Sequence, residues 1–345
     1  MFKYGKTRGI GSMMSLFALL LIVPGLPGAS VAARQPPPHM AQGGGIIIEL
    51  DNEFIKKYEN RATIGSEFSI VKLSKVHAPA DDAEVHVGGW SEEAGLATVA
   101  EVMNAASSGT IPRLAFVNAL AAGQKVNVTG AWRIWCEHGG TTAQIQVIGP
   151  KPPGTLPGAA PSNPDHVFEI HPVTEVKVGA MVTSATNAIG PSTGFTPHTA
   201  DEAFLPEYER LTCTIIPKNT RTRIVTEASK YNFTDFVFQL GENPFELDDG
   251  YGMIGSVFST SGELLVNNRR VVFIKGTAAG DLVKAARKGD RFHLTGIPRI
   301  SLKLVQYRLT HRNELKQQFG TDPLSWRLPY EMIAVAAVPL SGIDD

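Results

Sequence analysis

Residues 111–134, IPRLAFVNALAAGQKVNVTGAWRI, align without a gap on residues 277–300, TAAGDLVKAARKGDRFHLTGIPRI. Each segment begins with helix-type apolar spacing, reaches a glycine, Gly123 or Gly289, and continues as a strand with alternating side chains that ends in Thr-Gly. A glycine after an amphipathic helix is suited to a left-handed cap, and a glycine within a strand is typical of a bend or bulge. The internal repeat therefore predicts two copies of one helix-and-strand unit.

The rest of the chain contains mainly short segments with strand-type periodicity. Many short strands with one or two helices per copy predict a mainly β protein, made of two duplicated small barrels like those that bind oligonucleotides or oligosaccharides (OB-like barrels). A second match, of residues 60–69 on residues 220–229, also indicates duplication. The expected strands lie at 62–72, 83–88, 142–148 and 166–177 in the first half, and at 211–216, 234–240, 251–258, 263–275 and 331–338 in the second.

The N-terminal composition differs from that of the rest. Residues 1–33 begin with basic side chains, continue into the apolar run LFALLLIV and end in small residues around Ala33, as a cleaved secretory signal peptide does. That run is shorter than the roughly 20 residues that a membrane-spanning helix needs. We therefore expect an exported protein, periplasmic or secreted, without a transmembrane segment after cleavage.

Composition also predicts the domain boundaries. Residues 34–45 are rich in proline and glycine, as in a flexible linker, and residues 181–204 include a second stretch rich in glycine, proline, serine and threonine. The first OB-like domain is accordingly expected at 46–180, and the second at 205–340.

The charge balance bears on the class of partner. The chain has 32 Lys and Arg against 33 Asp and Glu, a formal net charge of −1. Nucleic-acid binding requires a cationic surface, so nucleic acid is not an expected partner. A small ligand, a glycan or another protein remains.

Histidine and acidic side chains are concentrated in three segments of the first half, 81–86, 132–138 and 163–173. Side chains alternate along a strand, so Glu169 and His171 are expected on one face. Imidazole with carboxylate is the ligand set of catalytic zinc and related metals, which makes a divalent metal such as zinc a candidate cofactor. The candidate ligand-binding residues are Glu84, His86, His138, Glu169, His171 and Trp135, and the candidate metal ligands among them are His86, His138, His171 and Glu169.

The alternative is that these groups lie on solvated strand faces. Carrying the repeat register onward places Ala334 and Ala336 opposite Glu169 and His171. The pair is therefore predicted to be peculiar to the first copy, as expected of a function added to a scaffold.

Arg133 and Arg299 occupy matched positions after the two Thr-Gly turns. Each is expected to hold a carboxylate of its own copy, for instance Glu67 and Glu227, because both partners recur in the second match.

Tryptophan and cysteine leave alternatives open. Trp132 and Trp135 have opposite strand parity, so one is expected in the core and the other on the surface, where it can stack on a ligand. Cys136 and Cys213 are a possible disulfide in an oxidising compartment or two independent buried thiols.

Three pieces of the first half carry a family resemblance. They are GQKVNVTG (123–130), WRIWCEH (132–138) and DHVFEIHPV (165–173). They resemble a group of uncharacterised bacterial exported proteins with OB-fold-like domains. The resemblance implies the fold and no particular activity.

Three functions follow as hypotheses. The first is a non-catalytic binding or structural module of the cell envelope that uses the first copy for its ligand. The alternative is a metal-dependent hydrolase, and the third is a scaffold that pairs its strand edges with other proteins. On the hydrolase hypothesis, the catalytic centre is expected among Glu84, His86, His138, Glu169 and His171. Whether the protein is an enzyme stays open at this point.

Overall fold

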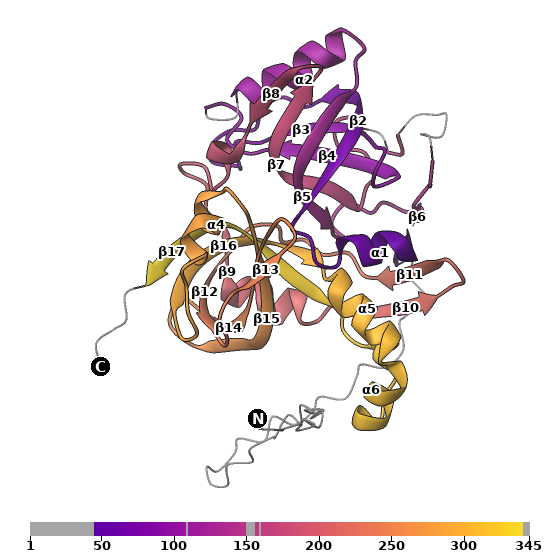
Figure 1. The fold of residues 1–345 in the computed structure, drawn as a ribbon, viewed down its shortest axis with the longest axis vertical. Coiled ribbons are helices and arrows are strands. Elements are labelled where there is room, and N and C mark those ends of the chain that lie inside the picture. The colour runs from indigo at the N-terminus through magenta and orange to yellow at the C-terminus, as the bar shows by residue number, and fades with distance from the viewer. Residues whose placement is uncertain (1–44, 108–109, 150–155, 159, 341–345) are drawn as a thin grey trace, which may run out of the picture. The chain divides into compact units, whose positions relative to one another are not determined.

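Each copy of the repeat folds into a closed barrel of five strands (Figure 1). The computed structural model describes residues 45–107, 110–149, 156–158 and 160–340. The first barrel has the order β2-β3-β4-β7-β5 and closes where β5 pairs with β2, and the second has the order β12-β14-β15-β17-β16 and closes where β16 pairs with β12. In both barrels, the third strand in chain order pairs in parallel with the fifth: β4 with β7 in the first barrel and β15 with β17 in the second. The predicted mainly β fold with two small barrels is confirmed.

The elements of the barrels correspond one to one. A helix precedes the fourth strand in each copy, α2 (Thr110–Ala121) in the first and α4 (Ala278–Val283) in the second. The first barrel consists of β2 (Thr63–Leu73), β3 (Val85–Ser91), β4 (Leu96–Val102), β5 (Val126–Ile134) and β7 (Phe168–Val178), with β6 (Gln144–Ile145) outside it and β8 (Met181–Ser184) on its edge. The second consists of β12 (Thr234–Leu240), β14 (Gly250–Phe258), β15 (Leu264–Ile274), β16 (Arg291–Ile300) and β17 (Tyr330–Leu340), with edge strands β9 (His198–Thr199) and β13 (Phe245–Leu247).

A third sheet combines strands from both halves of the chain. Its order is β10-β11-β1-β6, so β1, which precedes the first barrel, pairs with β11, which precedes the second. Residues 181–204, expected as a linker, contribute β8 to one barrel and β9 to the other. The remaining strands are β1 (Ile46–Asp51), β10 (Cys213–Pro217) and β11 (Arg221–Thr226), and the helices are α1 (Asn52–Tyr58), η1 (Thr186–Ala188), α3 (Ala200–Ala203), η2 (Phe204–Tyr208), α5 (Leu302–Thr310), α6 (Arg312–Phe319) and η3 (Pro323–Ser325).

Two sequence expectations concern the N-terminus and the membrane. The predicted signal peptide, residues 1–33, and residues 34–44 of the predicted linker lie outside the described residues. None of the helices in the described ranges is long and apolar enough to span a membrane.

The repeated glycines have the backbone roles that the sequence predicts. Gly123 and Gly289 both adopt positive φ, 62° and 94°, in the chain between helix and strand. The Thr-Gly pairs of β5 and β16 both coincide with a break in strand register, between Thr129 and Gly130 and at the matched place in the second barrel. A bulge of this kind bends the strand as a small barrel requires.

Alanine at Gly130 is expected to cost about 3 kcal/mol of folding free energy, against roughly 1 kcal/mol at Gly296. A Cβ at Gly130 would overlap the carbonyl oxygen of Pro172, whereas at Gly296 the nearest atom is the carbonyl oxygen of Ile333 at 3.1 Å. Urea denaturation of the two variants measures the difference. Equal losses would show that the bulge in β5 moves away from Pro172 without cost.

The second sequence match is wrong. Residues 220–229 lie mainly in β11, which pairs with β1 and β10 in the third sheet. The counterpart of β2 is β12, because β12 pairs with β16 as β2 pairs with β5. The match of residues 60–69 on residues 220–229 therefore does not reflect the duplication.

The two barrels pack against each other through reciprocal contacts. Arg133 donates from Nε to the carbonyl oxygen of Pro298 at 3.0 Å, and Arg299 donates from Nη1 to the carbonyl oxygen of Trp132 at 3.0 Å. Both residues of each contact are matched in the repeat, which is the pattern of a two-fold interface between copies. An apolar cluster contains residues of both barrels, among them Met103, Ala131, Val272, Ile297 and Ile333.

Candidate functional site

A buried arginine–glutamate pair occupies matched positions in the two barrels. Arg133 forms an ion pair with Glu169 on the neighbouring strand, and Arg299 donates from Nε to Glu331 at 2.7 Å. Each arginine holds a carboxylate of its own barrel, as expected. The suggested partners are wrong, because Glu67 pairs with Lys125 and Glu227 accepts a hydrogen bond from the hydroxyl of Thr212.

The strand register corrects the comparison of Glu169 and His171 with the second copy. Glu169 faces Arg133 as Glu331 faces Arg299, so its counterpart is Glu331 and not Ala334. Glu169 is therefore part of the arginine–glutamate pair that both barrels contain. His171 is matched by Ile333 in the same register, so the histidine remains peculiar to the first barrel.

Three buried carboxylates converge on His171. Its Nε2 lies 3.0 Å from Oε1 of Glu84, and its Nδ1 lies 2.9 Å from Oε2 of Glu101. Nδ1 is also 3.4 Å from Oε2 of Glu169. All four residues are buried, and the imidazole ring packs at 73° to the ring of Phe233, with 5.5 Å between the ring centroids. We refer to Glu84, Glu101, Glu169 and His171 as the inner cluster.

The inner cluster is electrostatically unbalanced. Burial by itself would lower the pKa of His171, but the charges of Glu101 and Glu84 raise it well above its usual value. Burial would raise the pKa of Glu169, but Arg133 and neighbouring histidines lower it well below its usual value. Three carboxyl groups thus face two cationic side chains, His171 and Arg133. The surplus negative charge favours a further cation.

His86 faces the free oxygens of two members of the inner cluster. Glu84 and Glu101 each direct one oxygen to His171, and their other oxygens lie 3.8 and 3.7 Å from Nε2 of His86. These distances are too long for hydrogen bonds. They match the roughly 3 to 4 Å between neighbouring ligand atoms that bind one metal at about 2.0–2.2 Å. Ligand atoms of Glu84, Glu101 and His86 all lie within 4.8 Å of one another, so these three residues could hold one metal ion.

The negative charge of Glu84 and Glu101 also acts on His86, whose side chain is 14% exposed. Burial would lower its pKa, but Glu101 and then Glu84 raise it to about 9. A position that favours the imidazolium also favours a metal cation, which carries more charge. A bound metal would take the place of that proton.

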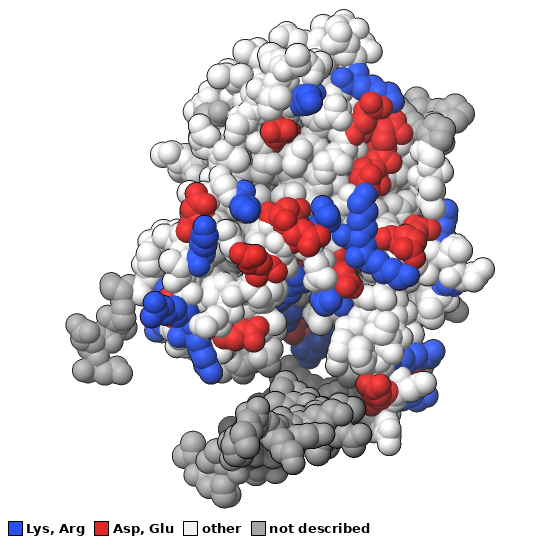
Figure 2. Space-filling view, in the orientation of Figure 1, with Lys and Arg blue, Asp and Glu red and all other residues white. Residues whose placement is uncertain are grey.

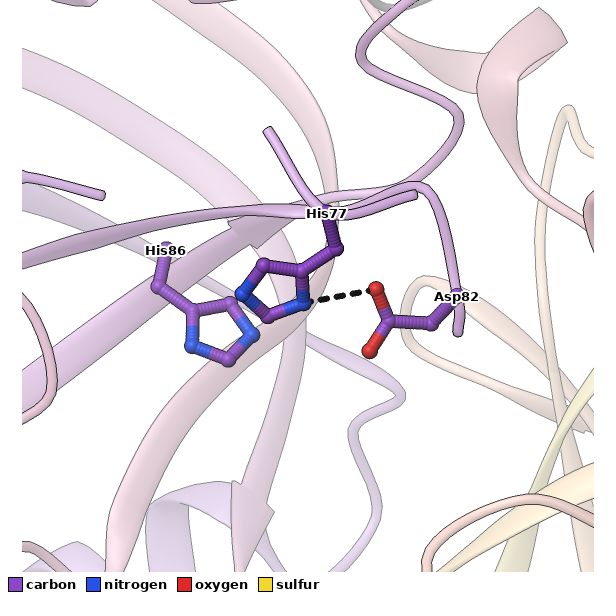
Figure 3. A group of neighbouring side chains, drawn as sticks. All are labelled: His77, Asp82 and His86. Carbon is purple, nitrogen blue, oxygen red and sulfur yellow. Dashed lines mark hydrogen bonds and ion pairs between the residues drawn. The ribbon is translucent and has the colours of Figure 1, made fainter. Parts of the chain in front are cut away.

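His77 and Asp82 lie outside His86, toward solvent. Nδ1 of His77 is 2.8 Å from Oδ1 of Asp82, and the ring centroids of His77 and His86 are 4.6 Å apart. Figure 3 shows the ring of His77 between the other two side chains. The turn before β3 positions them, because Asp82 accepts a hydrogen bond from the backbone N–H of Glu84 at 2.9 Å. A turn, and not strand alternation, therefore places Asp82 beside His77 and His86.

His138 does not join these groups. Its side chain is 40% exposed, lies 3.7 Å from Glu137 and stacks on His166, with 5.2 Å between ring centroids. His166 in turn lies 3.4 Å from Glu169. The prediction of His138 as a metal ligand is not supported, because it lies outside the ligand-type groups that the described residues form.

The predicted ligand-stacking role of Trp135 is wrong. Its ring is buried and meets the edges of Tyr208 and Tyr330. Trp132 is buried too, and Cζ of Arg299 lies over its ring, 3.6 Å from the centroid. The expectation that one of the two tryptophans is exposed is therefore wrong as well. Both belong to the packing of the protein.

Cys136 and Cys213 are two independent buried thiols and not a disulfide. Burial raises the pKa of Cys136 to about 12 and that of Cys213 to about 11. A thiol with a raised pKa is a poor nucleophile at neutral pH. Cys136 is therefore not a catalytic candidate.

Sequence reasoning missed Glu101, His77 and His166. Glu101 is the one acidic residue in the apolar run LATVAEVM, and an isolated charge in a buried strand is the signal that marks it.

The second barrel has no histidine or carboxylate at the positions that match this site. By strand register, the residues that match Glu84, His86, Glu101 and His171 are Gly250, Gly252, Val272 and Ile333.

No protein-family model matches the chain, and no curated protein matches it. The site alone carries the functional argument. The resemblance to exported proteins stays a prediction.

Proposed function

We propose that this chain is an exported, non-catalytic binding protein built on two OB-type barrels, and that its ligand is one divalent metal ion held by Glu84, Glu101 and His86. The second barrel is its structural partner. The strand order of both barrels and the helix before the fourth strand support the OB assignment.

The arrangement around Glu101 and Glu84 carries the proposal. His171 takes one oxygen of each carboxylate and leaves the other directed at His86. A side chain that holds metal-ligating carboxylates in place from behind is a common feature of metal sites.

The donor set indicates the class of metal. One imidazole with two carboxylates suits zinc, manganese or iron(II). Calcium and magnesium prefer all-oxygen sites. We therefore propose a transition-series divalent cation, as the histidine content of the sequence suggests.

Binding is favoured over hydrolysis because the ligands are buried. A catalytic metal keeps an open position beside a substrate cleft. One cavity of about 290 Å³ is lined by Asp51, Glu92 and Glu93, by residues of α1 and by Gln146–Gly149, and none of these residues belongs to the proposed metal site. On the face drawn in Figure 2, acidic and basic side chains are intermixed, which supports a small ligand over nucleic acid.

The test is metal stoichiometry. Chelator-treated protein is dialysed against Zn²⁺ or Mn²⁺, and bound metal is measured by mass spectrometry. We expect one ion per chain, and affinity at least about 100-fold lower in Glu101→Gln and His86→Ala. Both variants are checked for folding by circular dichroism.

His138→Ala is the matched control, because this half-exposed histidine of the same barrel lies outside the site. It is expected to bind as the wild type does. Wild-type protein that binds neither metal, or equal affinity in all variants, would refute the proposal.

A further inference from the structure

We propose that His77, Asp82 and His86 form an outer site, through which the metal ion enters and leaves the proposed metal site. We call that metal site, formed by Glu84, Glu101 and His86, the inner site. This inference rests on the proposed function. It assigns a role to two side chains that do not bind the metal at equilibrium.

The two groups share a residue and follow one another from solvent inward. Ligand atoms of the outer three residues lie within 4.8 Å of one another, and so do those of the inner three. Side-chain exposure falls from 33% at His77 and 23% at Asp82 to 14% at His86. Glu84 and Glu101, at the inner end, are buried. A cation that reaches the inner carboxylates along this series passes His77 first.

The shared histidine makes the two sites mutually exclusive. A neutral imidazole has a single nitrogen with a free lone pair, because the other nitrogen carries a proton. His86 can therefore bind a metal in the outer group or in the inner group, but not two metals at once. The inner group has two carboxylates against one outside and lies where water screens charge less. The inner site is the resting position, and the outer site is occupied in passing.

The outer and inner residues are held on one piece of backbone. The N–H of His77 donates to the carbonyl oxygen of Glu84 at 2.8 Å, and Ser74 exchanges hydrogen bonds with the backbone of His86. His77 and Asp82 thus stay at fixed positions beside His86. A cation can move between the two groups by rotation of side chains, without a change in the fold.

The competing explanation is structural. Asp82 already accepts hydrogen bonds from His77 and from the N–H of Glu84, which suffices to stabilise the turn. On that explanation, removal of His77 changes the stability of the turn and leaves the rates of metal exchange unaltered. The two explanations differ in kinetics, so exchange rates decide between them.

The experiment measures zinc exchange in the full chain. Zn²⁺-loaded protein is mixed with excess 4-(2-pyridylazo)resorcinol, and absorbance follows the release of metal. Uptake by chelator-treated protein is followed by stopped flow. In His77→Ala we expect release and uptake both to slow about tenfold, with equilibrium affinity within about twofold of wild type. Asp82→Asn keeps the acceptor for the turn and is expected to slow exchange in the same direction.

His198→Ala is the control, since this exposed histidine lies in the second barrel. It should exchange zinc at the wild-type rate. Unchanged rates in His77→Ala overturn the outer site, and a loss of affinity without a change in uptake makes His77 a permanent ligand, which also overturns it. Wild-type protein that binds no zinc removes the proposed function itself, and the outer site with it.

Discussion

Isoleucine in place of His171 is expected to lower the free energy of unfolding by about 4 kcal/mol, although isoleucine is the matched residue, Ile333, in the second barrel. The substitution leaves Glu84, Glu101 and Glu169 buried together with one cation fewer among them. Burying an uncompensated charge costs several kcal/mol, far more than the loss of one contact. Urea denaturation with a chelator present measures the effect, because bound metal would otherwise contribute to stability.

A triple variant separates charge from packing. Glu84→Ala, Glu101→Val and His171→Ile together remove two of the three buried acids along with the imidazolium, and Glu169 keeps its ion pair with Arg133. Replacing a buried ionic group by apolar residues is often neutral or stabilising, so the triple variant is expected within about 2 kcal/mol of wild type and should bind no metal. If it is as unstable as His171→Ile alone, the loss arises from packing around the imidazole and not from unpaired charge.

The scaffold follows from the sequence because the duplication displays it twice. The helix, the positive-φ glycine and the Thr-Gly bulge recur in residues 111–134 and 277–300, and the structure places them alike. β4 escaped prediction because a strand buried on both faces has a continuous apolar run with no alternation. Glu101 lies on that strand and was missed with it.

Strand alternation explains both the successes and the failures at the site. It correctly places Glu169 and His171 on one face of β7, and it misleads after Ile134, where β5 ends. Trp135 and His138 follow that end, so their directions depend on tertiary packing and not on parity. The register of β17 was also beyond the sequence, because the loop before it differs between the copies and includes α5 and α6.

Glutamine in place of Glu331 is expected to cost about 4 kcal/mol and to flatten the dependence of stability on pH. Oε1 of Glu331 accepts from Arg299 at 2.7 Å, and Oε2 accepts from Arg270 at 2.9 Å. Burial, together with repulsion from Arg270, lowers the pKa of Arg299 to about 10 even with Glu331 present. Without that carboxylate, the guanidinium groups of Arg270 and Arg299 remain next to each other, and that of Arg299 is fully buried.

The sign of the pH effect follows from Glu331. Burial would raise its pKa, but Arg270 and Arg299 lower it below the ordinary value of 4.5. A carboxyl group whose pKa is depressed by folding stabilises the protein above its unfolded-state pKa and loses that contribution as the pH falls through its folded-state pKa. Wild-type stability should therefore fall with pH below about 4.5 more steeply than that of Glu331→Gln.

Glu169→Gln is the matched substitution in the first barrel and is expected to cost clearly less. Arg133 keeps a second carboxylate there, Glu137 at 3.0 Å, and His171 keeps Glu84 and Glu101 as partners. The same change at matched positions thus leaves the buried arginine of the second barrel without its carboxylate, whereas the buried cations of the first barrel keep carboxylate partners. Chemical denaturation of both variants in chelator measures the contrast. Equal losses would show that both barrels require the carboxylate for packing alone, and that the second carboxylate partner of Arg133 does not compensate for the loss of Glu169.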